Sequence, residues 1–299
     1  MTNTPCAECY IKFWGVRGSV PTPGPGTVKY GGNTSCVELR ADGQIIVLDA
    51  GTGIRLLGLE LAKEFSGAGF EMTLLISHTH WDHIQGFPFF LPAYQSKNTV
   101  LVLGYEGARK GLASTLAGQM ESPYFPIALG QMPGNVVIEE LQGFEFQIGP
   151  VQAKATTVNH PGIAVGYRLA TSKGTVAYLP DNEPFHADQH GYARERIDLQ
   201  NHKLIDFIRD TDVLIIDSQY DTDEYASHIG WGHGSVEEVV RLAMLGGVKR
   251  LYLFHHDPGH DDNRIDAMLA HARKVAEGEP IEVYAATEGE VVVLGESVH

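Results

Sequence analysis

Short apolar runs rich in β-branched and aromatic residues recur along the chain, separated by glycine, proline and polar residues. Runs of about four to eight such residues are typical of β-strands. The pattern predicts strands at residues 10–16, 35–41, 44–50, 72–78, 99–105, 135–141, 151–158, 164–170, 175–181, 212–218, 250–256 and 281–287.

Between some of these strands, apolar residues recur at spacings of three and four, which predicts amphipathic helices. The predicted helices cover residues 53–65, 235–247 and 264–278. Ser235 and Glu238 have the spacing of a capping box, in which a serine begins a helix and a glutamate follows three residues later. The glycines at 246–247 predict the end of the same helix.

Strands dominate the first part of the chain, and strands alternate with helices later. This order favours an α/β protein in which two mixed β-sheets lie inside flanking helices. We find no polar linker, so we expect a single domain over residues 1–299. Residues 105–134 predict a helix and then a Pro/Gly-rich loop, which we interpret either as a lid or insert near a site or as plain irregularity.

Composition and charge narrow the class of protein. The 299 residues are 43% hydrophobic and 20% charged, which is ordinary for a globular protein. No apolar run approaches the roughly 20 residues that cross a bilayer, so we expect no membrane partner. Three cysteines make no disulfide framework and no secretory signal is evident, so we expect a cytoplasmic protein.

The net charge is −15, with 22 basic residues against 37 acidic ones, and no cluster of Lys or Arg stands out. Proteins that bind long polyanions usually gain affinity from Lys and Arg that release counterions. A small substrate, or one held by metal ions, suits this balance better than a long nucleic acid.

One segment concentrates groups that bind metals. The sequence Ser77-His78-Thr79-His80-Trp81-Asp82-His83 places three histidines and an aspartate at the end of an apolar strand. His78 and His80 lie two apart on extended chain, so their side chains point the same way. Asp82 and His83 follow in the turn. Imidazole and carboxylate ligands without thiolate suit zinc, manganese or iron.

One catalytic metal needs only about three protein ligands, so four local ligands with distant ones suggest two metal ions. The distant candidates each close an apolar run before a turn, and each could instead be a strand-capping residue. They are His160, Asp181, Asp217, and either His255 or His256.

The sequence resembles the metallo-β-lactamase-fold hydrolases, which carry His-x-His-x-Asp-His followed by a His, an Asp and a His in that order. The resemblance runs from "WGVRGSVPTPG" and "LDAGTG" to "LFHHDP". It implies an αββα four-layer sandwich. It also implies a set of site residues: His78, His80 and His160 at one metal, Asp82, His83 and His255 at the other, Asp181 bridging the two, and Asp49 supporting the ligands from behind.

Within this family, His80 favours hydrolysis, because members that run redox chemistry on two irons have Glu there. His233 and Ser235 open a helix in "GWGHGSVEEVV", which resembles the His-Ser-Thr element of the phosphodiesterase branch and its tRNA 3′-processing endonucleases. The resemblance makes His233 a general acid. The alternative is that His233 is a turn residue and Ser235 a helix cap.

The tRNA-processing members insert a long arm between the His and Asp motifs. Here only residues 161–180 separate His160 from Asp181, as in armless relatives that cleave small phosphodiesters. We therefore expect a phosphodiesterase with two divalent metals, zinc first and manganese or iron as alternatives. The catalytic residues would be Asp82 and His233, the first-choice substrate a cyclic nucleotide, and a homodimer follows from the resemblance alone.

Three rival interpretations stay open. The first is a tRNA or RNA 3′-processing endoribonuclease without the arm. The second is a thiolester, lactone or β-lactam hydrolase that uses the same metals. The third is a binding or sensor module that kept the fold without catalysis, and the intact ligand set argues against it.

Overall fold

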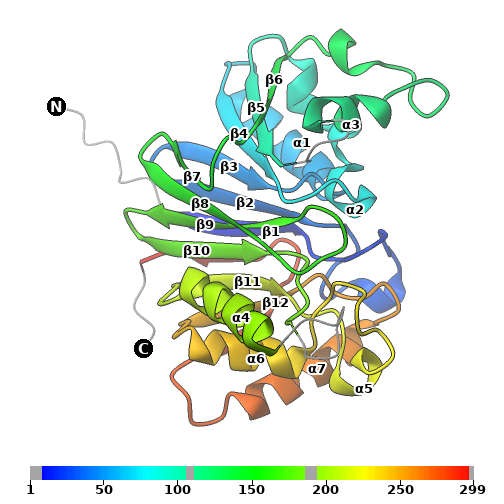
Figure 1. The fold of residues 1–299 in the computed structure, drawn as a ribbon. Helices are drawn as coiled ribbons and strands as arrows, with labels where there is room; N and C mark the ends of the chain where they lie inside the picture. Colours follow the sequence, from blue (N-terminus) through cyan, green and yellow to red (C-terminus); the bar gives the residue numbers. More distant parts are fainter. Residues whose placement is uncertain (1–8, 106–110, 186–193, 296–299) are drawn as a thin grey trace.

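The computed structural model describes residues 9–105, 111–185 and 194–295. Two seven-stranded sheets lie face to face, with helices on the outer face of each (Figure 1). The expected αββα four-layer sandwich with two mixed sheets is therefore confirmed. The organisation as a single domain over the whole chain stays a prediction.

The first sheet has the strand order β14-β1-β2-β3-β4-β5-β6. Its neighbours from β14 to β3 pair antiparallel, and those from β3 to β6 pair parallel. The strands are β1 (Tyr10–Gly15), β2 (Cys36–Ala41), β3 (Gln44–Leu48), β4 (Glu71–Ile76), β5 (Thr99–Gly104), β6 (Asn135–Glu140) and β14 (Val291–Val293).

The second sheet has the order β13-β12-β11-β10-β9-β8-β7 and is built the same way. Strands β7 to β10 pair antiparallel, and β10 to β13 pair parallel. The strands are β7 (Glu145–Ile148), β8 (Val151–Thr157), β9 (Val165–Thr171), β10 (Gly174–Leu179), β11 (Val213–Asp217), β12 (Arg250–Phe254) and β13 (Glu282–Ala285).

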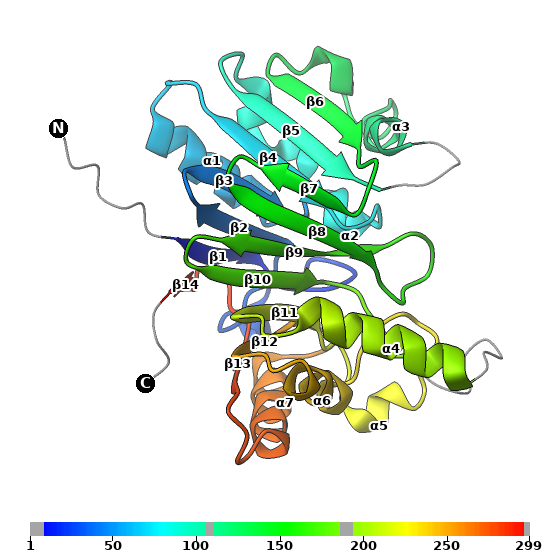
Figure 2. The same ribbon diagram turned by 60° about the vertical axis from the view of Figure 1, so that its left-hand side comes forward.

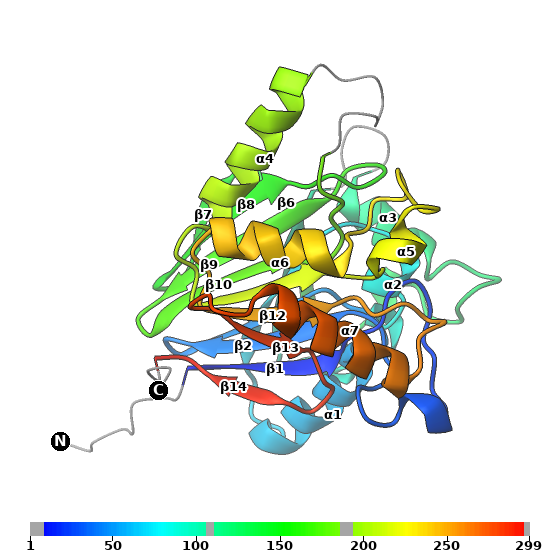
Figure 3. The ribbon, with the colours of Figure 1, turned by 90° about the horizontal axis from the view of Figure 1, so that it is seen from below.

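Helices form the two outer layers. Beside the first sheet are α1 (Ile54–Phe65), α2 (Trp81–Ile84) and α3 (Leu112–Gly118), and beside the second are α4 (Arg194–Ile208), α6 (Val236–Leu245) and α7 (Asp262–Val275) (Figure 2). Figure 3 shows α6 and α7 side by side. Shorter helical turns are α5 (Thr222–Tyr225), η1 (Pro25–Thr27), η2 (Phe87–Phe89), η3 (Leu91–Tyr94) and η4 (Leu129–Gln131).

Three apolar cores match these layers. The central core lies between the sheets and includes Phe13, Tyr167 and Phe254, all essentially inaccessible to solvent. A second core packs α1 and α3 against the first sheet, and a third packs α4, α6 and α7 against the second. Burial of apolar surface is the main favourable term in folding, so these cores hold the strand ends in place.

The twelve predicted strands all form, each within about two residues of its expected bounds. Strands β7 and β14 and helix α4 were missed, because β7 and β14 are only 4 and 3 residues long and α4 is strongly polar. Ser235 is the N-cap of α6, but its hydroxyl donates to Glu238 Oε2 at 2.9 Å and caps no backbone N–H.

Candidate metal centre

The residues singled out from the sequence come together where strands of both sheets end. His78 and His80 follow β4, while Asp82 and His83 lie in α2. The second sheet contributes the rest of the group: His160 after β8, Asp181 after β10 and His255 after β12. Strands of an α/β sheet commonly present ligands at their carboxyl ends, which explains why distant residues meet here.

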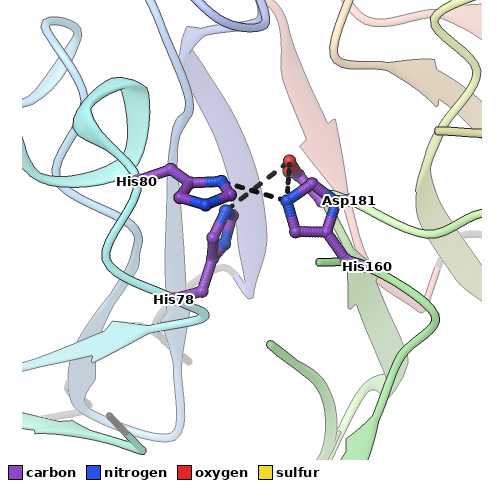
Figure 4. Close-up of side chains that lie close together, drawn as sticks. All are labelled: His78, His80, His160 and Asp181. Carbon is purple, nitrogen blue, oxygen red and sulfur yellow. Dashed lines mark hydrogen bonds and ion pairs between the residues drawn. The ribbon is translucent and has the colours of Figure 1, made fainter. Parts of the chain in front are cut away.

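The first group contains His78, His80, His160 and Asp181 (Figure 4). One potential ligand atom from each lies within 4.8 Å of the others. His160 Nε2 is 3.0 Å from His80 Nδ1. The Nε2 atoms of His78 and His160 each lie 3.6 Å from Asp181 Oδ2. His80 is exposed, so this group is open to solvent on one side.

The second group contains Asp82, His83 and His255, whose potential ligand atoms also lie within 4.8 Å of one another. Asp82 Oδ2 is 3.2 Å from His83 Nε2 and 3.1 Å from His255 Nε2. Asp181 Oδ1 faces the same two nitrogens, at 3.0 Å from His83 and 3.3 Å from His255. The Asp181 carboxylate thus turns one oxygen to each group.

Hydrogen bonds at the opposite ring nitrogens orient the imidazoles. His83 Nδ1–H donates to Asp49 Oδ2 at 2.8 Å, and His160 Nδ1–H donates to the Gly232 carbonyl at 2.9 Å. His255 Nδ1–H donates to Gln219 Oε1 at 3.1 Å. Each contact assigns the proton to Nδ1 and leaves the Nε2 lone pair facing the centre, which is the usual support for metal-binding histidines.

Asp49 is the hub of this supporting network. Its Oδ1 accepts from the Ser77 backbone N–H, and its Oδ2 accepts from the hydroxyls of Ser77 and Tyr178 at 2.7 and 2.8 Å. Asp49 has a left-handed backbone with φ of 62°, and His255 shares this feature with φ of 61°. Such conformations are uncommon for residues other than glycine and concentrate at functional sites.

Burial and neighbouring charge set the protonation of the centre. Burial lowers the pKa of His78 well below its usual value, and burial also lowers the pKa of His80 and His160. These three imidazoles are therefore neutral and able to bind a cation. Although burial opposes it, the carboxylates of Asp181, Asp82 and Asp49 raise the pKa of His83.

Within the described residues, three buried atoms at the centre make no hydrogen bond, although the last two face each other at 3.0 Å: His78 Nε2, His83 Nε2 and Asp181 Oδ1. Leaving such atoms unpaired is costly, and native proteins usually satisfy them. Coordination to metal would satisfy all three at once. The nitrogen and oxygen donors, with no thiolate among them, match zinc, manganese or iron, so the residues present fit two such ions.

The adjacent histidines at 255 and 256 point in different directions. His255 faces Asp82 and Asp181, as described above. His256 Nε2–H donates to the Ala286 carbonyl at 3.0 Å, and burial lowers the pKa of His256 to about 3. The geometry therefore favours His255 over His256 as a ligand.

His233 lies at the rim of the centre, in the turn before α6. Its ring stacks on His255 with centroids 5.0 Å apart, and its Nδ1 donates to Asp217 Oδ2 at 2.6 Å. Although burial opposes it, the carboxylates of Asp217, Asp181 and Asp82 raise the pKa of His233 to about 9. Asp217, a candidate ligand from the sequence, therefore partners His233 and belongs to none of the ligand groups.

Sequence reasoning missed Glu183, a buried carboxylate two residues after Asp181. It accepts from the backbone N–H groups of Gly230 and Gly232 and from the Tyr225 hydroxyl. These bonds fix the turn that contains His233. The same turn includes Gly232, whose carbonyl accepts from His160 Nδ1. Its chain position beside the Asp motif was the only signal in the sequence.

Residues 45–256 match the family model described as "Beta-lactamase superfamily domain", so the chain belongs to that superfamily. With the metallo-β-lactamase fold and the clustered His and Asp side chains, it is a metal-dependent hydrolase. The expected resemblance is confirmed. Within the described residues, no helix is both long enough and apolar enough to span a membrane.

The curated relatives include ribonuclease Z of Thermoplasma volcanium and of Thermoplasma acidophilum. The first is 23% identical over 83% of this chain and 87% of its own length. The second is 24% identical over 88% of this chain and 91% of its own length.

Solved structures with the same fold include the metallo-β-lactamase fold protein YhfI from Bacillus subtilis, with a TM-score of 0.67 and 17% identity. The short form of human tRNase Z has a TM-score of 0.62 and 18% identity, and a diphosphatase from the PhnP family has 0.61 and 15%. The matches cover 95–96% of this chain and 99% of each of those chains.

Proposed function

We propose that this protein hydrolyses a small phosphodiester, such as a cyclic nucleotide, with two divalent metal ions. His78, His80 and His160 would hold one ion, Asp82, His83 and His255 the other, and Asp181 would bridge them. The observation that carries this proposal is the Asp181 carboxylate, whose two oxygens face different groups of histidines. Zinc is our first choice of metal, with manganese or iron as alternatives.

When bound, the two ions would supply a water of lowered pKa and positive charge for the phosphate oxygens. The protein side chain that we expect to act directly on the leaving group is His233. Its contact with Asp217 favours the protonated form of the imidazole. Asp217 holds that imidazolium at the rim of the centre. We infer that His233 donates a proton to the leaving alkoxide.

Two features support a small substrate. Residues 161–180 are almost filled by the antiparallel strands β9 and β10, so no arm extends between His160 and Asp181. The net charge of −15 also disfavours a long polyanion, because few cations are available to replace its counterions. Both features are independent of the metal ligands.

The test is hydrolysis of bis-p-nitrophenyl phosphate by protein reconstituted with Zn²⁺ or Mn²⁺. We expect turnover that depends on metal. Either His80→Ala or Asp82→Ala should abolish it. Elemental analysis should find about two ions per chain in the native protein, as the two ligand groups imply, and fewer in each variant. Turnover that survives both substitutions would refute the proposal.

A second candidate is RNA 3′-end processing, because the curated relatives named above are ribonucleases Z. It predicts cleavage of a precursor tRNA at its 3′ end, with binding that weakens as salt rises. A comparison of kcat/KM for precursor tRNA and for cyclic nucleotides separates the two candidates.

Hydrolysis of a thiolester, lactone or β-lactam is the remaining alternative on the same metals. In that case phosphodiesters should be inert and His233→Ala should change the rate little. We also propose a homodimer, which light scattering of the purified protein would test.

A further inference from the structure

A cavity of about 440 Å³ is lined in part by the segment that carries four of the candidate metal ligands. One wall comes from the segment that carries the metal ligands, through Thr79 and Trp81, and continues to Phe89. The other wall comes from α3 and the loop after it, through Gln119 and Tyr124. Helices α2 and α3 lie close together in Figures 1 and 3.

The aromatic side chains of this cavity are unusually exposed. Trp81 is 77% exposed, Tyr124 is 79% and Phe89 is 57%. Phe89 also meets Phe125 edge to face, with ring centroids 5.4 Å apart. Exposed apolar groups that gather around a hollow commonly mark a binding site.

The cavity wall and the candidate ligands share one segment of the chain. Thr79 lies between His78 and His80, and Trp81 lies between His80 and Asp82. His80, between Thr79 and Trp81 in the chain, is itself exposed. Two residues of the cavity wall are therefore direct chain neighbours of candidate ligands.

We propose that this cavity receives the nucleobase of a nucleoside phosphodiester, an inference that rests on the proposed function. Bases stack on aromatic side chains, and their edges need hydrogen-bonding partners. The amides of Gln85 and Gln119 lie in the wall, and Gln119 Nε2 donates to the Ile84 carbonyl at 3.2 Å. The exposed aromatic side chains suit a planar occupant, and the strong negative charge opposes an anionic membrane surface.

The experiment compares two phosphates that differ only by the base. Adenosine 5′-monophosphate and ribose 5-phosphate are titrated by calorimetry into zinc-loaded protein. We expect the nucleotide to bind about ten-fold more tightly, since stacking of one base typically contributes that order of affinity. Trp81→Ala and Tyr124→Ala should each remove most of this preference, and Trp81→Phe should keep it.

Leu245→Ala, an exposed apolar residue on α6 away from the cavity, serves as the matched control and should leave the preference unchanged. Metal content is measured for every variant, so that weaker binding caused by loss of metal is distinguished from weaker binding caused by loss of stacking. Equal binding of the two phosphates would overturn the inference, as would a preference that survives both alanine variants.

The proposed function fails by a different result. In that case the metal-loaded protein would not hydrolyse bis-p-nitrophenyl phosphate at all. A protein that turns over this substrate but shows no preference for the base keeps the function and loses only the nucleobase site.

Discussion

At the scale of single residues, the site depends on side chains that serve two partners at once. Asp181 divides its oxygens between two groups of histidines, and Asp49 accepts from His83, Ser77 and Tyr178 together. Buried polar groups of this kind are costly to leave half satisfied. Single substitutions here should therefore lower stability as well as activity.

The proton donor can be tested through its partner. His233→Ala should lower kcat for an alkyl phosphodiester by about 10²–10⁴-fold, the usual contribution of a general acid. Asp217→Asn should cause part of that loss, because it removes the charge that keeps His233 protonated. The measurement is kcat on alkyl and aryl diesters with metal content fixed.

An aryl leaving group needs little protonation, so the aryl diester is the internal control. Equal losses on both diesters would show that His233 acts through structure and not as an acid.

Glu183 is the second residue-scale test. Glu183→Gln should weaken the hold on the backbone N–H groups of Gly230 and Gly232 and so disturb both His233 and His160. We expect a loss of about 10–100-fold in activity or metal affinity, the range typical of groups that orient metal ligands. The thermal midpoint, measured alongside, should change little; activity equal to that of the wild type would contradict the role.

At the scale of elements, the site lies at the carboxyl ends of parallel strands. Contacts at the opposite ends of those strands help to stabilise their pairing. Asp212 lies just before β11 at the opposite end of the sheet. It accepts from the backbone N–H of Thr175 at 2.7 Å and from Lys249 Nζ at 2.6 Å. It therefore ties the start of β10, β11 and β12 together.

Asp212→Ala should lower the free energy of unfolding by about 0.5–1.5 kcal/mol, since the part-buried backbone N–H of Thr175 loses its acceptor, whereas water can solvate the exposed Lys249 ammonium. Although partial burial opposes it, the contacts with Lys249 and Thr175 lower the pKa of Asp212 below its usual 3.8. A lowered carboxyl pKa stabilises the fold above the unfolded-state pKa, and that contribution is lost as pH falls through the folded-state value.

Urea unfolding of wild type and variant at pH 7 and near pH 3 measures this difference. The gap between the two proteins should shrink at the lower pH. A gap that is the same at both values would exclude the charge as its cause.

At the scale of the whole molecule, the centre joins the two halves of the sandwich. His78, His80, Asp82 and His83 follow strands of the first sheet, and His160, Asp181 and His255 follow strands of the second. A metal centre that needs ligands from both sheets would form only in the folded protein, where the two sheets lie together. Ligand binding of this kind stabilises the folded state by mass action.

Metal removal should therefore lower the thermal midpoint. At a free metal concentration of about 100 times Kd, binding adds about 2.7 kcal/mol, which corresponds to a shift of several degrees for a chain of this size. Differential scanning fluorimetry with and without a chelator measures the shift. The thermal midpoint of His80→Ala should fall less when the chelator is added. A wild-type midpoint that the chelator leaves unchanged would show that metal does not stabilise the contact between the two sheets.

Much of this was determined by the sequence alone. The alternation of apolar runs and turns gave twelve strands, because burial imposes a period on the side chains of each strand. The segment 77–83 predicted a metal centre, because so many ligand groups at a strand end have few other uses. The resemblance to the metallo-β-lactamase-fold hydrolases then singled out His160, Asp181 and His255 as expected partners for that segment, whereas their place at strand ends alone left Asp217 and His256 open as well.

Only the tertiary structure decided which neighbour each side chain meets. His255 and His256 are adjacent and chemically identical, yet one faces the centre and the other a backbone carbonyl. Asp217 could have been a ligand and instead partners His233, and Glu183 gave no signal beyond its place beside the Asp motif. These outcomes depend on contacts between residues far apart in the chain, which local periodicity and spacing do not encode.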